Sequence, residues 1–269
     1  MKILVCVKHV PDPDGLVFNA GGDGRVSMGE AAGYRMNRYD EFAVEEGLRV
    51  REKTGNTAID VLTVGPGRSK EVLRRAVGMG ADRGIHLVTG KDGYVSPMVK
   101  AAWIADYARG KNYDLILTGA MSEDMMNAQL GPMVAVFLEM PWATQVICAD
   151  LPSGQDSVSD PGKTRLSIER EIEGGSREML EITLPAVLAV QTGINEPRYP
   201  SLSNLLRANR QDVETLDMPS PGAEGCNAPD GMEGMVMPKK MRAGRRLEGT
   251  SLQKAEALAA ILKQRALIS

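Results

Sequence analysis

The stretch that most constrains the fold lies at residues 114–132, where an apolar run is followed by a polar loop and a helical pattern. Residues 115–117 are apolar and end at a Thr-Gly pair, which is typical of a buried strand in a parallel sheet. Apolar residues then recur with helical spacing over 126–137, which predicts a helix that ends before Pro141. The stretch therefore predicts one strand–loop–helix unit of an α/β fold.

A helix that begins directly after a parallel strand points its unpaired N–H groups and its positive dipole end at the carboxyl edge of the sheet. A phosphate is stabilised there without a lysine. Short polar side chains able to bond ribose hydroxyls and base edges occupy the same stretch, namely Ser122, Asp124, Asn127 and Gln129. The pattern fits a nucleotide-binding loop, and it equally fits an ordinary loop whose polar residues cap the helix.

The rest of the first half repeats the same unit. Apolar runs predict strands at 3–7, 59–64 and 85–88, and helical patterns follow at 40–53, 69–79 and 96–108. This alternation predicts a doubly wound, mostly parallel, Rossmann-like sheet with right-handed crossovers. Ligands of such sheets bind at the carboxyl ends of strands, so the loops after Val7, Val64 and Thr118 are expected to converge.

Two details of this half are also predicted. The long segment from residue 8 to 36 is rich in Gly, Pro and Asp, and is expected to be a loop with a short hairpin around 21–24. In the helix over 40–53, Val44 and Leu48 face the core, and Glu45 and Arg49 are expected to pair on the outer face.

The second half has a different pattern. Alternating residues at 165–171 and 178–183, with a Gly-Gly turn between them, predict an antiparallel hairpin, and 186–190 predicts another buried strand. We therefore expect a nucleotide-binding domain over 1–210 and a C-terminal arm over 211–269. Residues 217–246 lack the apolar content of a core, whereas Thr250 and Gln253 predict a capped terminal helix. The arm is either a disordered tail or, as we expect, a segment that packs on a partner subunit.

Composition excludes several classes of function. The 269 residues carry a net charge of −3 with interspersed signs and only 4% aromatic residues, which argues against nucleic-acid binding. Three widely spaced cysteines and two histidines predict neither a disulfide framework nor a metal site. No apolar run is long enough for a membrane helix or a signal peptide, so a cytoplasmic protein is expected. The segment 161–164 lacks the first glycine of a phosphate loop, and no G-x-G-x-x-G follows the first strand.

Several motifs, taken in order, resemble the beta subunit of electron-transfer flavoproteins. The signature region is Ile-Glu-Arg-Glu-Ile-Glu-Gly-Gly at 168–175, with Leu-Pro-Ala-Val at 184–187 and Asn-Glu-Pro-Arg-Tyr-Pro-Ser-Leu at 195–202. The resemblance extends to residues 36–37, 43–46, 78–86 and the loop at 119–131, and so covers the chain from residue 2 to about 210.

The resemblance implies a subunit of a heterodimer that carries electrons from flavoprotein dehydrogenases, such as acyl-CoA dehydrogenases, to an acceptor, without catalytic residues of its own. It implies AMP as a structural ligand in this subunit and a redox-active FAD held mainly by the alpha subunit. The AMP contacts would fall on Cys6, Asn37, Arg38, Tyr39, Asp40, Val64, Gly119, Glu123, Asp124, Met125, Met126, Asn127, Ala128, Gln129, Leu130 and Gly131.

Two surfaces are implied in the same way. Glu169, Arg170 and Glu171 of the signature strand would face the alpha subunit and its flavin. Leu202, in the loop over 200–205, would anchor onto client dehydrogenases through an exposed apolar side chain.

Two other functions stay open. Residues 128–132 and 10–12 are similar to the electron-bifurcating branch of the family, in which the same site holds a second FAD that reacts with NADH. Arg38 also stands where the family commonly has proline. A stress-type ATP-binding protein of the same architecture is the third possibility, although the chain lacks a phosphate loop.

Overall fold

The computed structural model describes residues 1–15, 18–21, 26–29, 33–90, 94–151, 164–219, 234–236, 244, 246–265 and 267. The chain divides into two compact units, one made of residues 1–19 and 28–233 and the other of residues 20–27 and 234–269. Much of the predicted arm, and residues 161–163 of the segment like a phosphate loop, lie outside the described residues. Among the described residues, no helix has the length and apolar character needed to cross a membrane.

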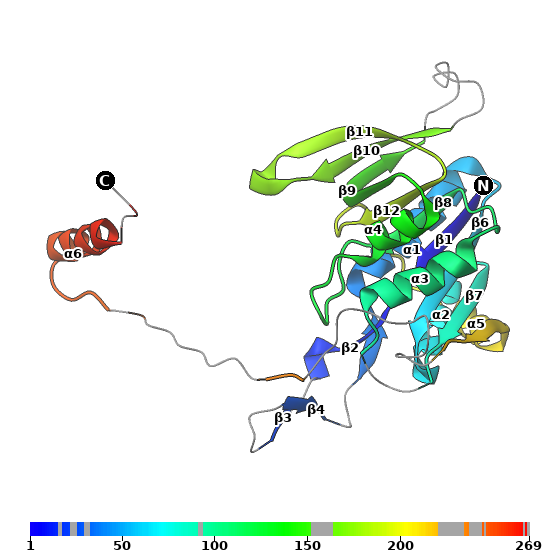
Figure 1. The fold of residues 1–269 in the computed structure, drawn as a ribbon, viewed down its shortest axis with the longest axis horizontal. Coiled ribbons are helices and arrows are strands. Elements are labelled where there is room, and N and C mark those ends of the chain that lie inside the picture. Colours follow the sequence, from blue (N-terminus) through cyan, green and yellow to red (C-terminus); the bar gives the residue numbers. More distant parts are fainter. Residues whose placement is uncertain are drawn as a thin grey trace. The chain divides into compact units, whose positions relative to one another are not determined.

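A nine-stranded sheet forms the frame of the first unit (Figure 1). Its strands run in the order β11 (Arg177–Thr183), β10 (Arg165–Glu171), β9 (Trp142–Asp150), β12 (Ala186–Val190), β8 (Leu115–Gly119), β1 (Lys2–Cys6), β6 (Ala58–Gly65), β7 (Arg83–Val88) and β13 (Val213–Asp217). All neighbours from β9 to β13 pair in parallel, whereas β9, β10 and β11 pair antiparallel. The predicted mostly parallel sheet with an antiparallel hairpin is confirmed.

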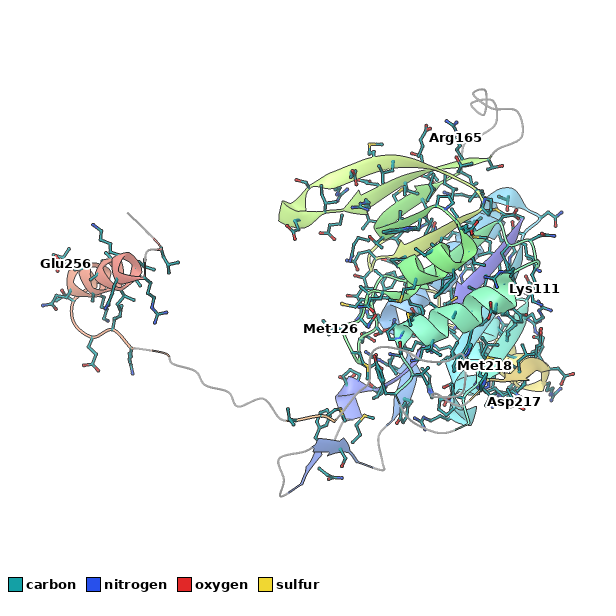
Figure 2. All side chains as sticks on the ribbon, in the orientation of Figure 1. Lys111, Met126, Arg165, Asp217, Met218 and Glu256 are labelled. Carbon is teal, nitrogen blue, oxygen red and sulfur yellow. The ribbon has the colours of Figure 1, made fainter. Side chains whose placement is uncertain are left out.

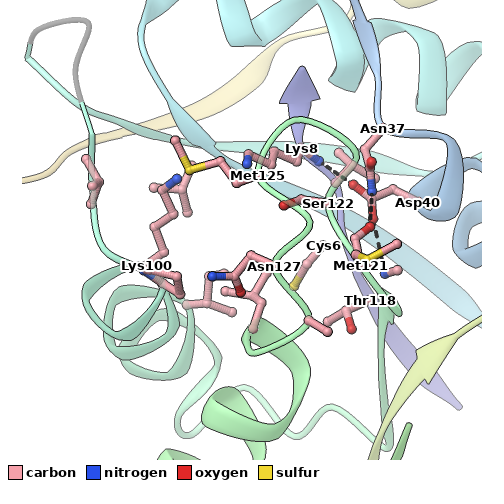
Figure 3. Close-up of a pocket in the computed structure, with 18 of the residues that line it drawn as sticks. Cys6, Lys8, Asn37, Asp40, Lys100, Thr118, Met121, Ser122, Met125 and Asn127 are labelled. Carbon is pink, nitrogen blue, oxygen red and sulfur yellow. Dashed lines mark hydrogen bonds between the residues drawn. The ribbon is translucent and has the colours of Figure 1, made fainter. Parts of the chain in front are cut away.

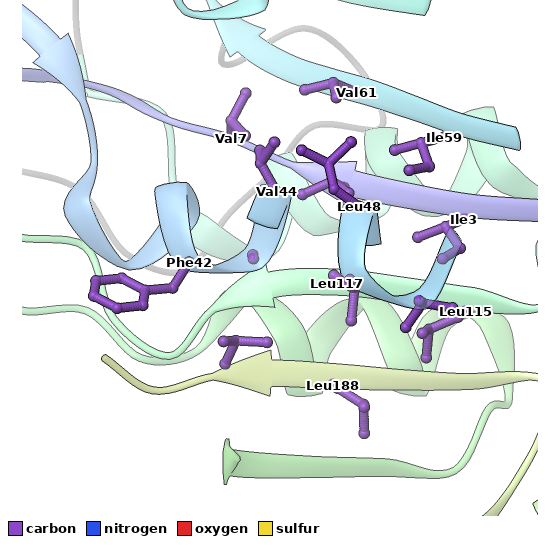
Figure 4. Packing of buried hydrophobic residues seen from close by; sticks show 14 of the residues in the cluster. Ile3, Val7, Phe42, Val44, Leu48, Ile59, Val61, Leu115, Leu117 and Leu188 are labelled. Atoms are coloured by element: carbon purple, nitrogen blue, oxygen red, sulfur yellow. The ribbon is translucent and has the colours of Figure 1, made fainter. Parts of the chain in front are cut away.

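Helices cover both faces of this sheet because neighbouring strand residues point to opposite sides. Ile3 and Val5 share a buried cluster with residues of α1 (Arg38–Thr54) and α2 (Lys70–Met79), part of which is drawn in Figure 4. Leu4 and Cys6 share the second cluster with residues of α3 (Pro97–Ala108) and α4 (Leu130–Leu138), which lie in front of the sheet in Figure 1. The doubly wound architecture follows from this alternation.

The segment between β1 and α1 contains short strands. β2 (His9–Pro11) pairs antiparallel with β5 (Tyr34–Met36) after the 3-10 turn η1 (Pro13–Gly15), and β3 (Phe18–Ala20) forms a two-stranded sheet with β4 (Val26–Met28). β3 and β4 thus pair where the hairpin was predicted, and residues 22–25 between them lie outside the described residues. Two further 3-10 turns, η2 (Gly67–Ser69) and η3 (Glu173–Gly175), precede α2 and join β10 to β11.

Some elements differ from the sequence-based expectations. The helix predicted from Met126 begins only at Leu130, because Met126 has a left-handed φ of 51° that interrupts a helix. β9 and α5 (Leu202–Arg210) were not predicted. β13 pairs with β7, so the sheet continues past the expected domain end at residue 210.

The second unit contains α6 (Ser251–Gln264), whose predicted cap is confirmed. Thr250 Oγ1 accepts a hydrogen bond from the Gln253 backbone N–H at 3.4 Å, and Gln253 Oε1 accepts one from the Thr250 N–H at 2.9 Å. No described residue of α6 is buried, and Leu252 is 69% exposed. The helix is locally well formed, and within the described chain Leu258 is also exposed, at 48%, whereas Ile261 and Leu262 are half-buried.

Candidate functional site

A pocket lies where the carboxyl ends of β1, β6 and β8 meet, as the parallel sheet predicted (Figure 3). It encloses about 730 Å³ of non-protein space, part of which is open to solvent. Its lining consists of Cys6, Val7, Lys8, Asn37, Asp40, Val64, Tyr94, Val95, Pro97, Lys100, Ile104, Thr118, Gly119, Met121, Ser122, Met125, Asn127, Ala128 and Leu130.

Asp40, in the first turn of α1, ties two strand ends together at this pocket. Its carboxylate accepts hydrogen bonds from the backbone N–H of Lys8 at 2.7 Å and from that of Gly119 at 3.1 Å. Burial raises the pKa of Asp40 to about 7, although the hydrogen bonds to the carboxylate oppose the shift. A side chain at position 119 would overlap Asp40 Oδ1 and Tyr39 Cβ, so only glycine permits this close approach.

Asn37, which precedes α1, shapes the loop between β8 and α4. Its Nδ2 donates to the Met121 carbonyl at 2.9 Å, and its Oδ1 accepts from the Glu123 N–H at 3.0 Å. The Glu123 carboxylate in turn accepts from the Arg38 N–H at 3.0 Å. These contacts fix residues 121–123 against α1, so the loop is held on one wall of the pocket.

The amino end of α4 forms another wall. Asn127 Oδ1 accepts from the Gln129 N–H at 2.9 Å, just before the helix begins. A Cβ at Gly131 would lie 2.8 Å from Thr118 Oγ1 and 3.2 Å from Ala189 Cβ, so glycine lets α4 approach the sheet closely. The first-turn N–H groups of α4 are therefore held near the pocket, where they favour an anion.

The wall also contains polar atoms without partners. Thr118 Oγ1 and Ser122 Oγ are buried and form no hydrogen bond within the described part of the chain. Buried hydroxyl groups usually have a partner, and Ser122 can reach into the pocket by rotation about χ1. This donor and acceptor set fits the phosphate and ribose of a nucleotide. Burial and then the charge of Asp40 raise the pKa of the Cys6 thiol, so the thiol stays protonated and is not suited to act as a nucleophile.

The structure brings many of the predicted contacts together. Cys6, Asn37, Asp40, Val64, Gly119, Met125, Asn127, Ala128 and Leu130 line the pocket. Arg38, Tyr39, Glu123, Asp124, Met126, Gln129 and Gly131 neighbour it in sequence but are not part of its lining. Among these, Asp124 pairs with Lys8 at 2.6 Å, and Met126 is 68% exposed.

Sequence reasoning missed the contribution of α3. Tyr94, Val95, Pro97, Lys100 and Ile104 line the pocket from the segment after β7. The sequence did contain a feature that could have predicted this wall of the pocket. The Ser-Pro pair at 96–97 predicted the start of a helix directly after a parallel strand. The Ser96 hydroxyl does accept from the Met98 N–H at 3.2 Å as the cap of α3.

The predicted docking residue lies on a helix rather than in a loop. Leu202 is the first residue of α5 and is 73% exposed, next to Tyr199 at 88%. On the inner side, Leu205 packs closely on α2, where a Cβ at Gly78 would lie 2.9 Å from Leu205 Cδ2. Leu202 therefore projects from a helix that is itself packed on the domain.

The chain before α5 is held by carboxylates of α1, and this corrects the expected Glu45–Arg49 pair. Glu45 is buried and accepts two bonds from the Arg198 guanidinium, at 2.7 and 2.8 Å. Arg49 instead lies 3.7 Å from Glu46. The prediction that Glu45 lies on the outer face of α1 failed because Arg198 comes from a distant part of the sequence. The i, i+4 spacing within α1 cannot reveal such a contact.

The signature strand lies apart from the pocket, on β10. Glu169 is 3.1 Å from Arg177, and Arg170 is 2.9 Å from Glu178, in both cases across the hairpin. Glu169 and Glu171 line a second hollow together with Arg177 and Gly193. The hairpin thus presents a charged, half-exposed surface.

Comparisons with known proteins agree with this arrangement. A family model described as electron transfer flavoprotein domain matches residues 26–221. The chain is 31% identical to the electron transfer flavoprotein subunit beta of Methylophilus methylotrophus over 98% of both chains, and 30% identical to that of Bacillus subtilis over 99% of both. It is 32% identical to the Bos taurus subunit over 80% of this chain and 81% of the relative. The chain therefore belongs to the family of electron transfer flavoprotein beta subunits.

Proposed function

We propose that this chain is the beta subunit of a heterodimer that passes electrons from flavoprotein dehydrogenases, such as acyl-CoA dehydrogenases, to an acceptor, with AMP bound in the pocket. The observation that carries the proposal is the pocket itself, where the amino end of α4 and the buried, unpartnered hydroxyls of Thr118 and Ser122 meet at the carboxyl edge of the sheet. The electron-transfer chemistry belongs to an FAD held mainly by an alpha subunit.

In this proposal different groups of the protein contact the phosphate, the ribose and the adenine of AMP. The amino end of α4 would hold the phosphate, Asn127 and Ser122 would bond the ribose, and Cys6 and Val64 would contact the adenine. Asp40 would act by holding the strand ends in place. AMP would then be a structural ligand that stabilises the loop at 121–129.

Reduction of the assembled protein tests the proposed function. The chain produced together with an alpha subunit should yield a flavin that a reduced acyl-CoA dehydrogenase reduces and that NADH does not reduce. Absence of reduction by any flavoprotein dehydrogenase of this class would contradict the electron-carrier proposal.

The electron-bifurcating function is the second candidate, in which the same pocket holds FAD. Residues 128–132 favour it because they are similar to that branch. Rapid NADH oxidation by the heterodimer would select this candidate over the first. The stress-type ATP-binding protein has no comparable support, since the family match is to electron transfer flavoproteins.

We expect Leu202→Ala to lower kcat/KM for reduction by a client dehydrogenase about tenfold. The exposed leucine would lose its apolar burial in the complex, which is worth about 1.5–3 kcal/mol for a fully buried side chain. Flavin content should not change, because the cap of α5 comes from Ser201. Val136→Ala, an exposed aliphatic on α4, is the matched control and should leave the rate unchanged. An unchanged rate for Leu202→Ala would remove the docking assignment.

The exposed leucines of α6, Leu252 and Leu258, and the half-exposed β10–β11 hairpin are proposed to contact the alpha subunit. We expect limited proteolysis to cut the segment between β13 and α6 at least about tenfold more slowly in the heterodimer than in the isolated chain. The physical reason is that burial by a partner restricts local opening. Equal cleavage rates in both states would show that the arm does not pack on the partner.

A further inference from the structure

Lys100 occupies an unusual place for a cation. It lies in the first turn of α3, near the positive end of the helix dipole, where cations are unfavourable. Its side chain is partly buried and lines the pocket. In Figure 3, the Lys100 side chain extends from α3 toward Met125, and Lys8 lies at the same mouth of the pocket. The position carries a free-energy cost that some other interaction must offset.

Within the described part of the chain, no group forms a hydrogen bond or ion pair with the Lys100 ammonium. Lys8, by contrast, pairs with Asp124 at 2.6 Å. The charged and titratable groups that line the pocket with Lys100 are Cys6, Lys8, Asp40 and Tyr94. Asp124, beside the pocket in the loop before α4, also acts electrostatically on Lys100. The nearest anion is thus already engaged by another lysine.

The protonation of Lys100 reflects this environment. Burial, followed by repulsion from Lys8, lowers its pKa to about 8, although Asp124 opposes the shift. A partly desolvated ammonium without a counter-ion is costly, and an anion placed beside it removes much of that cost.

We propose that Lys100 binds the phosphate of the nucleoside 5′-phosphate that occupies the pocket, from the α3 side. The inference rests on the proposed function, since it takes an adenylate as the ligand. In addition to the amino end of α4, the phosphate would then contact a cationic side chain. The proposal also explains why a lysine in the first turn of α3 faces a cavity. α3 and α4 would then bind the phosphate from two different walls of the pocket.

Because Lys100 gains or loses a proton near pH 8, its contact with the phosphate makes the affinity for AMP depend on pH. Below pH 8 the free Lys100 is charged, so its contribution to affinity is fully present. Above pH 8 the free chain loses the proton, and AMP binding must take it up again. The affinity for AMP should therefore fall as the pH rises from about 8 toward the higher pKa of the complex, by at most about tenfold per pH unit.

Calorimetric titration of the full-length protein with AMP tests the proposal, with any co-purified nucleotide first removed. We expect Lys100→Met to weaken binding at pH 7 by at least about tenfold, as for loss of a charge-assisted contact. Lys100→Arg should keep the affinity near the wild-type value at pH 7 but abolish its decrease between pH 8 and 9.5, because arginine stays charged. Lys111→Met removes the same charge at the opposite end of α3, as Figure 2 shows, and should change neither quantity.

Proton uptake separates Lys100 from Asp40, whose pKa of about 7 also lies near neutral pH. At pH 8.5, binding heats in two buffers of different ionisation enthalpy should show uptake of a fraction of a proton by the wild type and almost none by Lys100→Arg. Unchanged uptake in Lys100→Arg, or unchanged affinity in Lys100→Met, would overturn the role of Lys100. Absence of AMP binding by the wild type would instead refute the proposed function.

Discussion

Replacing Gly131 with valine is expected to abolish AMP binding and to lower the free energy of unfolding by about 2–3 kcal/mol. The cause is steric, because the added Cβ would lie 2.8 Å from Thr118 Oγ1 and 3.2 Å from Ala189 Cβ. The first turn of α4 would have to move away from β8 and β12. Its N–H groups would then no longer point at the phosphate position.

Thermal unfolding with and without AMP measures both effects. The wild-type protein should unfold at a higher temperature when AMP is present, and Gly131→Val should show no such shift. Gly15→Val is the matched control, since nothing lies within 4 Å of a Cβ at that position. An AMP-induced shift of wild-type size in Gly131→Val would show that the close approach of α4 to the sheet is not needed for binding.

Replacing Asp40 with asparagine is expected to remove a pH dependence of stability. The folded-state pKa of Asp40 is about 7, against an ordinary value of 3.8, because the carboxyl group is buried. Between pH 4 and 7 the folded chain therefore keeps a proton that the unfolded chain releases. Ionisation of Asp40 thus lowers the free energy of unfolding as the pH rises through this window, by at most about 1.4 kcal/mol per pH unit.

Urea unfolding from pH 4 to 8 checks this sign. At pH 5, Asp40→Asn should be less stable than the wild type by about 1–3 kcal/mol, since one of the N–H groups of Lys8 and Gly119 loses its acceptor. This difference in the free energy of unfolding should shrink as the pH rises toward 7, because only the wild type is destabilised by an ionised buried carboxylate. Asp14→Asn, at an exposed position, should show no such trend. Parallel pH profiles for the wild type and Asp40→Asn would refute this role of Asp40.

The sequence predicted the sheet and the edge at which the pocket lies because both depend on local patterns. Apolar runs followed by helices determine strand direction, and strand direction determines where the loops after Val7, Val64 and Thr118 meet. The hairpin of β10 and β11 was predictable for the same reason, since the alternation of residues over two runs identifies their paired strands.

The features that could not be predicted depend on distant contacts. Glu45 faces inward because Arg198 lies against it, and Asp40 is buried because the backbone N–H groups of Lys8, just after β1, and of Gly119, at the end of β8, donate to it. β13 carries little apolar pattern of its own and is a strand because it pairs with β7 at the edge of the sheet. Lys100 was missed because a phosphate at a helix amino end requires no lysine, so nothing in the local pattern required a cation.

Identification of the bound nucleotide tests the central claim most directly. The heterodimer with its alpha subunit would be denatured with acid, and the released nucleotides would be separated chromatographically and quantified per protein. We expect one AMP and one FAD per heterodimer. Two FAD without AMP would replace AMP by the flavin of the bifurcating candidate, and release of no nucleotide beyond a single FAD would contradict the claim that this pocket holds an adenylate.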